Sequence, residues 1–208
     1  MIFTKAYSLP DYDRREIMRY AGVRESSPVL EGEMERCLAL CKGVFRGVVC
    51  YSRIGISVGD GCVETPFARL CSATLAKNLC GCREAVVFAA TVGAGIDRLI
   101  QRYAAVEIST AVWLQAIGAE RVEALCDVFC DELERLLACE GLHTRARFSP
   151  GYGDLPLETQ RAMTDFLDCR RKIGVTLGES LLMSPGKSVT AIVGAGMERE
   201  KDGCAYKK

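Results

Sequence analysis

Histidine is nearly absent from the sequence, and both net charge and long apolar runs are missing. One histidine among 208 residues is too few for the common histidine-containing zinc sites. The 27 lysines and arginines are balanced by 27 aspartates and glutamates, which argues against a nucleic-acid binder. No apolar run reaches about 18 residues, and residues 11–16 are mostly charged, unlike a signal peptide. We predict a soluble, cytoplasmic protein that binds neither nucleic acid nor membrane.

The usual cysteine frameworks are missing too, although the chain has twelve cysteines. No C-x-x-C occurs, and most cysteines lie in apolar segments, where a free thiol packs as a small hydrophobe. We therefore expect buried thiols in a reducing compartment and no bound metal. The exceptions are Cys80 and Cys82 in a predicted turn and Cys204 near the end of the sequence. A thiol or metal protein that uses these three cysteines is one alternative hypothesis.

The glycine-rich turns do not complete a nucleotide-binding motif. Gly93 and Gly95 follow an apolar run, as in a dinucleotide-binding turn, but Arg98 occupies the position of the third glycine. The Gly-Ala-Gly run at 194–196 has the same defect. A nucleotide phosphate site is therefore not predicted at either turn.

Hydrophobic periodicity predicts helices and strands in one main α/β domain. Helices are expected over residues 11–21, 30–42, 66–78 and 109–139 and after Pro156, and strands over 47–51, 54–58 and 84–91. The longest helix has an apolar stripe at Val122, Leu125, Cys126, Phe129, Leu133, Leu136 and Leu137. This stripe should lie across a sheet.

The first 45 residues contain two of these helices, so we divide the chain into three parts. Residues 1–45 form a helical N-terminal arm, residues 46–196 the core, and residues 197–208 a charged tail. Residues 1–10 either pair as a short edge strand or trail from the arm.

The densest run of turn residues and polar side chains extends from Arg147 to Val193. It begins with a tight turn, R-F-S-P-G-Y, in which Gly151 can adopt positive φ and let a ligand approach the main chain. Asp154 and Pro156 then open an amphipathic helix. Pro185-Gly186 is typical of a type II turn and predicts a hairpin between residues 180–183 and 188–193.

These residues carry a family resemblance. The R-x-x-x-G-Y turn, the later G-V-x-L-x-E-S-x-x-M-x-P segment and an S-V strand resemble the S-adenosylmethionine-binding reactivation domain of cobalamin-dependent methionine synthase. The matching residues are Arg147, Gly151, Tyr152, Gly174, Val175, Leu177, Glu179, Ser180, Met183, Pro185, Ser188 and Val189. The resemblance implies an α+β fold, with a twisted, largely antiparallel sheet flanked by helices.

It also implies a binding site for S-adenosylmethionine. Arg147 would hold the ligand's carboxylate through two parallel hydrogen bonds, Tyr152 would offer a ring and a hydroxyl, and Gly151 would allow close approach. Glu179 and Glu123 are candidate partners for the ammonium group. The chain departs from the family pattern after the motif, where Gly153-Asp154 follows, and in the tail, where Tyr206 is the only tyrosine.

The function implied is that of a free-standing reactivation subunit for a cobalamin-dependent methionine synthase or a related corrinoid protein. The chain would present S-adenosylmethionine for reductive methylation of oxidised cob(II)alamin carried by the partner, with a flavodoxin-like electron donor. Catalysis would then depend on positioning, which suits a chain without a catalytic triad. The alternative is a non-catalytic adaptor or chaperone that docks on a corrinoid methyltransferase.

Overall fold

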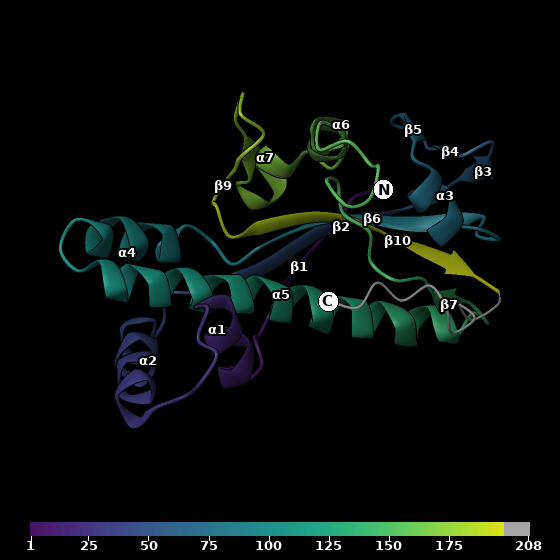
Figure 1. Cartoon of the computed structure of the whole chain (residues 1–208). Helices are drawn as coiled ribbons and strands as arrows, with labels where there is room; N and C mark the ends of the chain where they lie inside the picture. Colours follow the sequence, from purple (N-terminus) through teal and green to yellow (C-terminus); the bar gives the residue numbers. More distant parts are fainter. Residues whose placement is uncertain (198–208) are drawn as a thin grey trace.

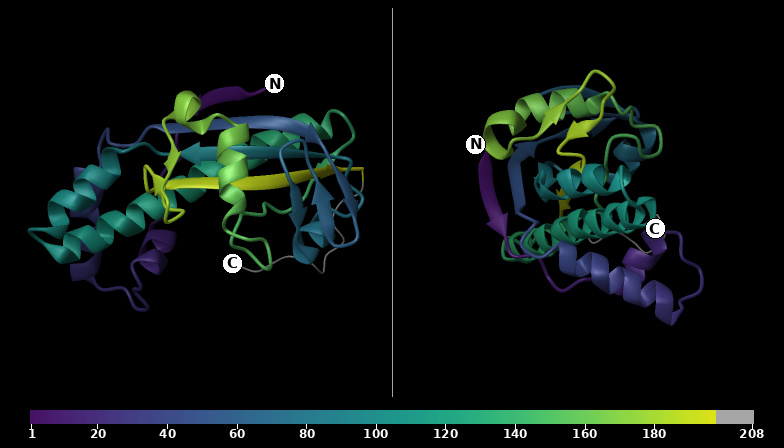
Figure 2. Two further views of the ribbon diagram at one scale, coloured as in Figure 1. Left: turned by 90° about the horizontal axis from the view of Figure 1, so that it is seen from above. Right: turned by 90° about the vertical axis from the view of Figure 1, so that its left-hand side faces the viewer.

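A curled five-stranded antiparallel sheet forms the centre of the protein (Figure 1; Figure 2). The computed structural model describes residues 1–197. The strand order is β1-β2-β6-β10-β7, and every neighbouring pair is antiparallel. The strands are β1 (Phe3–Tyr7), β2 (Gly47–Gly55), β6 (Glu84–Thr91), β10 (Ser188–Gly196) and β7 (His143–Thr144). The expected α+β class with an antiparallel sheet is confirmed.

Helices cover both faces of this sheet (Figure 1). On one face lies α5 (Ile108–Ala138), which is followed outward by α1 (Arg14–Tyr20) and α2 (Pro28–Leu40) and flanked by α4 (Gly95–Ala104). On the other face lie α6 (Thr159–Phe166) and α7 (Cys169–Ile173). Within residues 1–197, no helix is long and apolar enough to cross a membrane.

Two small sheets and one short helix complete the second face. A three-stranded sheet contains β3 (Ser57–Gly59), β4 (Cys62–Glu64) and β5 (Arg69–Cys71), and leads into α3 (Ala73–Asn78). A two-stranded sheet pairs β8 (Thr176–Leu177) with β9 (Met183–Ser184). The first of these sheets lies at the right-hand end of the molecule in Figure 1.

Strand β6 is apolar throughout because both of its faces are covered. Val86 and Phe88 pack into the core beneath α5, whereas Ala85 and Val87 pack into a second core beneath α6 and α7. Successive side chains of a strand point to opposite faces, so a strand between two helical layers has no polar side. The predicted buried strand at 84–91 is confirmed.

Helix α5 follows its predicted bounds closely and spans the sheet. Its apolar stripe is buried from Val122 to Leu137 with one exception, Leu136, which is 56% exposed and was wrongly placed in the stripe. Trp113 is 4% exposed and donates its indole N–H to Glu33 of α2 at 3.3 Å. The helix therefore joins the central sheet to the N-terminal helices.

The first 45 residues contain more than an arm. Strand β1 pairs with β2 over residues 3–7, which realises the edge-strand alternative. Asp13 caps α1, which begins later than the predicted residue 11, because its carboxylate accepts the N–H groups of Arg15 and Glu16. The boundary at residue 45 stays a prediction, and the tail at 198–208 lies outside the described residues.

The helix expected over 66–78 is only half correct. The Thr65 hydroxyl accepts the N–H groups of Phe67 and Ala68, which forms a turn between β4 and β5 instead of a helix cap. The helix begins only at Ala73, where Ser72 caps it. A hydroxyl before proline fits both a cap and a turn, and the pairing of β4 with β5 decides between them.

The hairpin expected around Pro185-Gly186 is wrong. Strand β9 pairs with β8, and β10 pairs with β6. Pro185 follows a cis peptide bond, and the Gly186 N–H donates to Asp97 of α4 at 2.8 Å. Strand β10 thus pairs with β6, which is distant in sequence, and does not pair with β9, as a local hairpin would require.

The glycine-rich turn before α4 has a packing role. A Cβ atom on Gly95 would lie 2.5 Å from the carbonyl oxygen of Val44. Side-chain carbons do not approach a backbone oxygen this closely, so only glycine fits here. The contact with Val44 accounts for Gly95. The likeness of this turn to a nucleotide-binding motif therefore needs no bound nucleotide to explain it.

Candidate functional site

A small cavity of about 140 Å³ lies between α5, α6, the R-x-x-x-G-Y turn and the start of β10. Its lining residues are Glu123, Arg147, Ser149, Pro150, Tyr152, Gln160, Met183, Ser188, Val189 and Thr190. Arg147, Tyr152 and Glu123, three of the five predicted site residues, therefore meet in one place. Gly151 lies between two lining residues.

Arg147 supplies a cation with one unused donor. Its side chain is only 16% exposed, and its Nη2 donates to a carboxylate oxygen of Glu123 at 2.5 Å. Its Nη1 is buried and has no hydrogen-bond partner within residues 1–197. A buried donor without a partner is costly, so this nitrogen is suited to an oxygen atom of a ligand.

Gln160 supplies the complementary acceptor. It projects from α6, is 5% exposed, and its Oε1 has no partner among the described residues. The cavity thus offers both a buried donor and a buried acceptor to a ligand. Gln160 could not be predicted from the sequence, because nothing in the pattern separates it from the other polar residues of an amphipathic helix.

The turn after Arg147 presents Tyr152 at the mouth of the cavity. Gly151 has a φ of +90°, which confirms the predicted need for glycine. The Tyr152 N–H donates to the Ser149 carbonyl at 3.1 Å, and the Gly151 N–H donates to the Leu155 carbonyl at 2.9 Å. The Tyr152 side chain remains 57% exposed, so one face of its ring is open to a ligand.

Asp154 anchors this turn to α3 and does not open a helix of its own. Its carboxylate accepts hydrogen bonds from the Ser72 and Thr74 hydroxyls and from the Ala73 N–H. Hydrogen bonds from Ser72 and Thr74 hold the pKa of Asp154 well below its usual range. The helix expected at this point begins only at Thr159, as α6.

The anchoring role predicts a pH-dependent loss of stability when Asp154 is replaced by Asn. The lowered pKa means that Asp154 stabilises the fold above its unfolded pKa of about 4 and loses this contribution as the pH falls through its folded value. Asp154→Asn should therefore lower the melting temperature at pH 7. The difference from the wild type should shrink on acidification, as measured by thermal melts from pH 7 to pH 2. An equal difference at both ends of this range would contradict the role.

Glu179, the fifth predicted site residue, lies apart from the cavity lining. It is exposed, in the turn between β8 and β9, where its backbone carbonyl accepts a hydrogen bond from Arg161 at 2.9 Å. Met183, Ser188 and Val189, which belong to the same resembling segment, do line the cavity. The resembling segment therefore contributes residues of β9 and β10 to the cavity lining, whereas its β8–β9 turn does not line the cavity.

The two cysteines of α5 nearest to Arg147 stay protonated. Burial raises the pKa of Cys130 to about 11 and moves that of Cys126 further in the same direction. A thiol is a nucleophile or metal ligand only as a thiolate. These cysteines are therefore packing residues.

The comparisons with known proteins identify the family. The model of the vitamin B12-dependent methionine synthase activation domain matches residues 68–201, more than half of the chain. The chain belongs to this family.

The fold of this activation domain is also found in a solved structure. The crystal structure of the MetH reactivation domain bound to AdoHcy is similar, with a TM-score of 0.72 and 13% sequence identity. The similarity covers 99% of this chain and 81% of the other. No curated protein sequence matches the chain.

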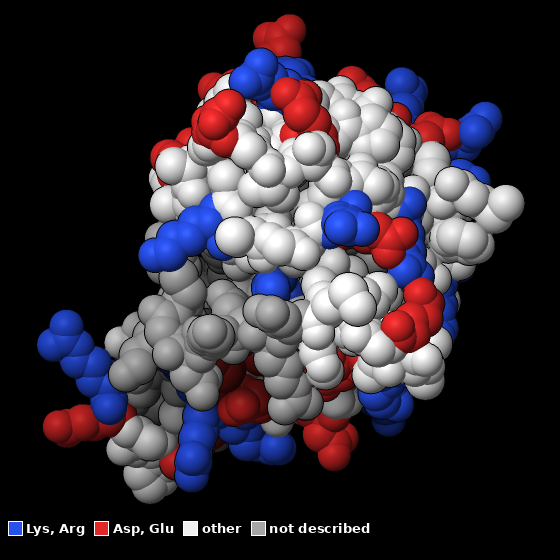
Figure 3. Space-filling view, turned by 90° about the vertical axis from the view of Figure 1, so that its right-hand side faces the viewer, with Lys and Arg blue, Asp and Glu red and all other residues white. Residues whose placement is uncertain are grey.

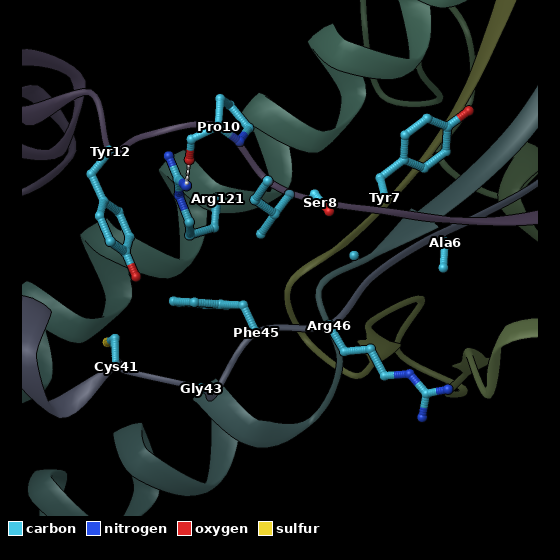
Figure 4. A pocket seen from close by; sticks show the side chains of 12 residues that line it. Ala6, Tyr7, Ser8, Pro10, Tyr12, Cys41, Gly43, Phe45, Arg46 and Arg121 are labelled. Carbon is cyan, nitrogen blue, oxygen red and sulfur yellow. Dashed lines mark hydrogen bonds between the residues drawn. The ribbon is translucent and has the colours of Figure 1, made fainter.

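The activation domain has a second, larger cavity, of about 450 Å³, below the edge strand β1 (Figure 4). Arg121 lies there at 2% exposure, with its guanidinium stacked 4.1 Å from the Tyr12 ring. Every nitrogen of this guanidinium has a partner: Glu120, the Pro10 carbonyl or the Asp11 carbonyl. The Arg121 guanidinium is therefore already satisfied and offers no unused donor to a ligand, unlike the guanidinium of Arg147.

The described part of the activation domain has no cluster of His, Cys, Asp and Glu suited to a metal ion. Cys80 is exposed and Cys82 is buried against the glycines of β10, whereas Cys204 lies outside the described residues. On the face shown in Figure 3, Lys and Arg are interspersed with Asp and Glu. This distribution agrees with the zero net charge of the whole sequence.

Proposed function

We propose that this activation domain binds S-adenosylmethionine in the Arg147 cavity and presents its methyl group for reactivation of a cobalamin-dependent methionine synthase. The observation that carries the proposal is the buried, unpartnered Nη1 of Arg147 in a cavity made by the family's motif. The similar solved structure contains AdoHcy, which is S-adenosylmethionine without the transferred methyl group. The residues of the cavity fit the amino-acid end of such a ligand.

Each polar group of that end has a counterpart. The Arg147 guanidinium can donate to a carboxylate through Nη1 while Nη2 stays paired with Glu123. Gln160 Oε1 and the remaining Glu123 oxygen can accept from the ammonium group. Glu179 remains a prediction for a second acidic contact, which would require its turn to approach the ligand.

The rest of the ligand would lie outside the cavity. Ligand pockets commonly enclose about 300 to 1,000 Å³, whereas this cavity holds about 140 Å³. The nucleoside would therefore lie over the exposed ring of Tyr152, where Gly151 leaves room for close approach. A partner protein would cover this open side, as expected for a site that delivers a methyl group to another protein.

The contribution of the chain to the reaction is positioning. The methyl group of the bound sulfonium would pass to cobalamin on the partner after a flavodoxin-like donor has supplied one electron to cob(II)alamin. Arg147, Glu123 and Gln160 would fix one end of the donor, and Tyr152 would orient the sulfonium toward the opening. No proton moves in this transfer, so the site needs no general base. The chain would act as one component of a methyltransferase system.

Calorimetric titration of S-adenosylmethionine into the purified protein tests the proposal. We expect saturable binding with one ligand per chain, and competition by S-adenosylhomocysteine. If binding is absent both alone and with a corrinoid methionine synthase added, the methyl-donor role is wrong. The adaptor hypothesis would then be favoured, provided that the protein still bound the corrinoid partner.

A further inference from the structure

Cys62 and Cys71 face each other across the small sheet of β3, β4 and β5. They are paired in the register of β4 and β5, and their sulfur atoms are 2.8 Å apart. The Ser72 N–H donates to the Gly61 carbonyl, and the Thr65 N–H donates to the Ala68 carbonyl. These bonds mark the hydrogen-bonded pairs of the ladder. Cys62 and Cys71 therefore form a non-hydrogen-bonded pair, in which Cα atoms are about 4.5 Å apart.

This spacing lies within the range that a disulfide accepts, about 4.4 to 6.8 Å between Cα atoms. The sulfur atoms already point at one another, so a bond needs only small side-chain adjustments. The other close pair, Cys50 and Cys169, has sulfur atoms 3.8 Å apart and is buried on both sides. Of the two pairs, only Cys62 and Cys71 combine close sulfur atoms with access from solvent.

The surroundings favour reaction at Cys71. Cys71 is exposed, whereas Cys62 is 9% exposed. Arg69, which pairs with Glu64 at 3.2 Å, lies two residues along the same face of the sheet. The hydrogen bond with Cys62 raises the pKa of Cys71, and the Arg69 charge opposes that rise. Access from solvent, and not acidity, therefore makes Cys71 the thiol that an oxidant in solution reaches first.

The pair is also connected to the turn of the Arg147 cavity. Cys71 directly precedes Ser72, whose hydroxyl accepts the Leu75 N–H and donates to Asp154. Gly153 packs so closely on Thr74 that a Cβ atom on this glycine would overlap the threonine hydroxyl. A displacement of the backbone at the end of β5 would therefore also displace Gly153 and Asp154, which follow Tyr152.

We propose that Cys62 and Cys71 are a redox-active dithiol that forms a reversible intramolecular disulfide with a low-molecular-weight disulfide, of the glutathione type, as oxidant. The Cys71 thiolate attacks one sulfur of the oxidant, and one thiolate leaves. The Cys62 thiolate then attacks the Cys71 sulfur, forms the Cys62–Cys71 bond and releases the second thiolate. Two protein thiols are oxidised, and one small disulfide is reduced to two thiols. This reaction does not depend on the proposed ligand.

Mass spectrometry after treatment of the folded full-length chain with oxidised glutathione tests the proposal. Trypsin should place Cys62 in the peptide 54–69 and Cys71 in the peptide 70–77, each with one cysteine. We expect a cross-link between these peptides that disappears on adding reduced glutathione. In a mixture of oxidised and reduced glutathione the cross-link should persist at a proportion of reduced glutathione about tenfold higher than the proportion that leaves Cys139, another exposed cysteine, unmodified, because the second thiol is held in place.

Two variants show which cysteine attacks the oxidant and which one completes the disulfide. Cys62→Ser should leave Cys71 as a stable mixed disulfide with glutathione, and Cys71→Ser should abolish the cross-link. Circular dichroism establishes that both variants are folded. A stable mixed disulfide at Cys71 in the wild type, or a cross-link that reduced glutathione removes as easily as it removes the modification of Cys139, would overturn the dithiol assignment.

Hydrogen exchange tests the connection to the cavity. Oxidation should change the exchange rate of the amides in residues 151–155, and it should not do so in the Cys71→Ser variant. Unchanged exchange in the oxidised wild type would overturn the coupling of the thiol pair to the turn.

Discussion

Replacing Arg147 by alanine should weaken S-adenosylmethionine binding by about 30- to 700-fold in Kd. Among residues 1–197, the buried guanidinium is the one cation in the cavity lining, and it would be the charged partner of the ligand's carboxylate. Removing one partner of a buried, hydrogen-bonded charge pair costs about 2 to 4 kcal/mol. Titration calorimetry of the wild type and the variant, at equal pH and ionic strength, measures this change.

Two further variants make the result specific. Arg14→Ala also breaks an arginine–glutamate ion pair, with Glu35, but neither residue lines the cavity, and the substitution should leave Kd unchanged. Arg147→Lys keeps the charge without the planar fork of donors, and should bind less tightly than the wild type but more tightly than Arg147→Ala. Equal Kd values for Arg147→Ala and the wild type would remove Arg147 from the site.

Replacing Arg121 by methionine should destabilise the protein by about 3 to 5 kcal/mol. Arg121 and Glu120 form an ion pair whose side chains are 2% and 4% exposed. Removal of the guanidinium leaves the Glu120 carboxylate buried, with the Asp13 N–H as its one remaining hydrogen-bond donor in the described part of the chain. It also frees the Pro10 and Asp11 carbonyls, which hold the chain between β1 and α1. Urea unfolding followed by circular dichroism measures the loss.

Two further variants distinguish the cost of an unpaired buried charge from the cost of lost packing. The double variant Glu120→Gln, Arg121→Met removes both charges and should recover part of the stability. Arg53→Met breaks ion pairs with Glu84 and Glu140 in which Arg53 is 35% exposed, and should cost about 0 to 1 kcal/mol. A loss at Arg121 as small as that at Arg53 would show that the buried pair contributes little.

The elements that the sequence predicted well are those in which one pattern decides the outcome. Helix α5 carries its apolar stripe over many turns, and β6 is apolar on both faces because helices cover both. The segment around Pro185 was harder, because its turn residues fit a local hairpin as well as a link between two sheets. That choice depends on β6, which is distant in sequence, so local patterns could not make it.

The same distinction applies to the site. Arg147 and Tyr152 were predicted because a short motif joins them, and Glu123 because of its polar position on a helix that the family also has; all three line the cavity. Glu179 belongs to the resembling segment, but the β8–β9 turn carries it away from the cavity lining. Gln160 gave no signal, since only the packing of α6 shows that its amide is buried without a partner.

The position of β10 next to β6 in the sheet has a consequence for folding during translation. Ser188 of β10 pairs with Thr91 of β6, 97 positions earlier. While the ribosome is still translating the intervening residues, β6 has an open edge and an apolar face. Long-range pairing of this kind is slow, and an unpaired apolar edge is prone to aggregation. Yields from rapid expression should therefore depend on cellular chaperones that shield β6 until β10 has been made.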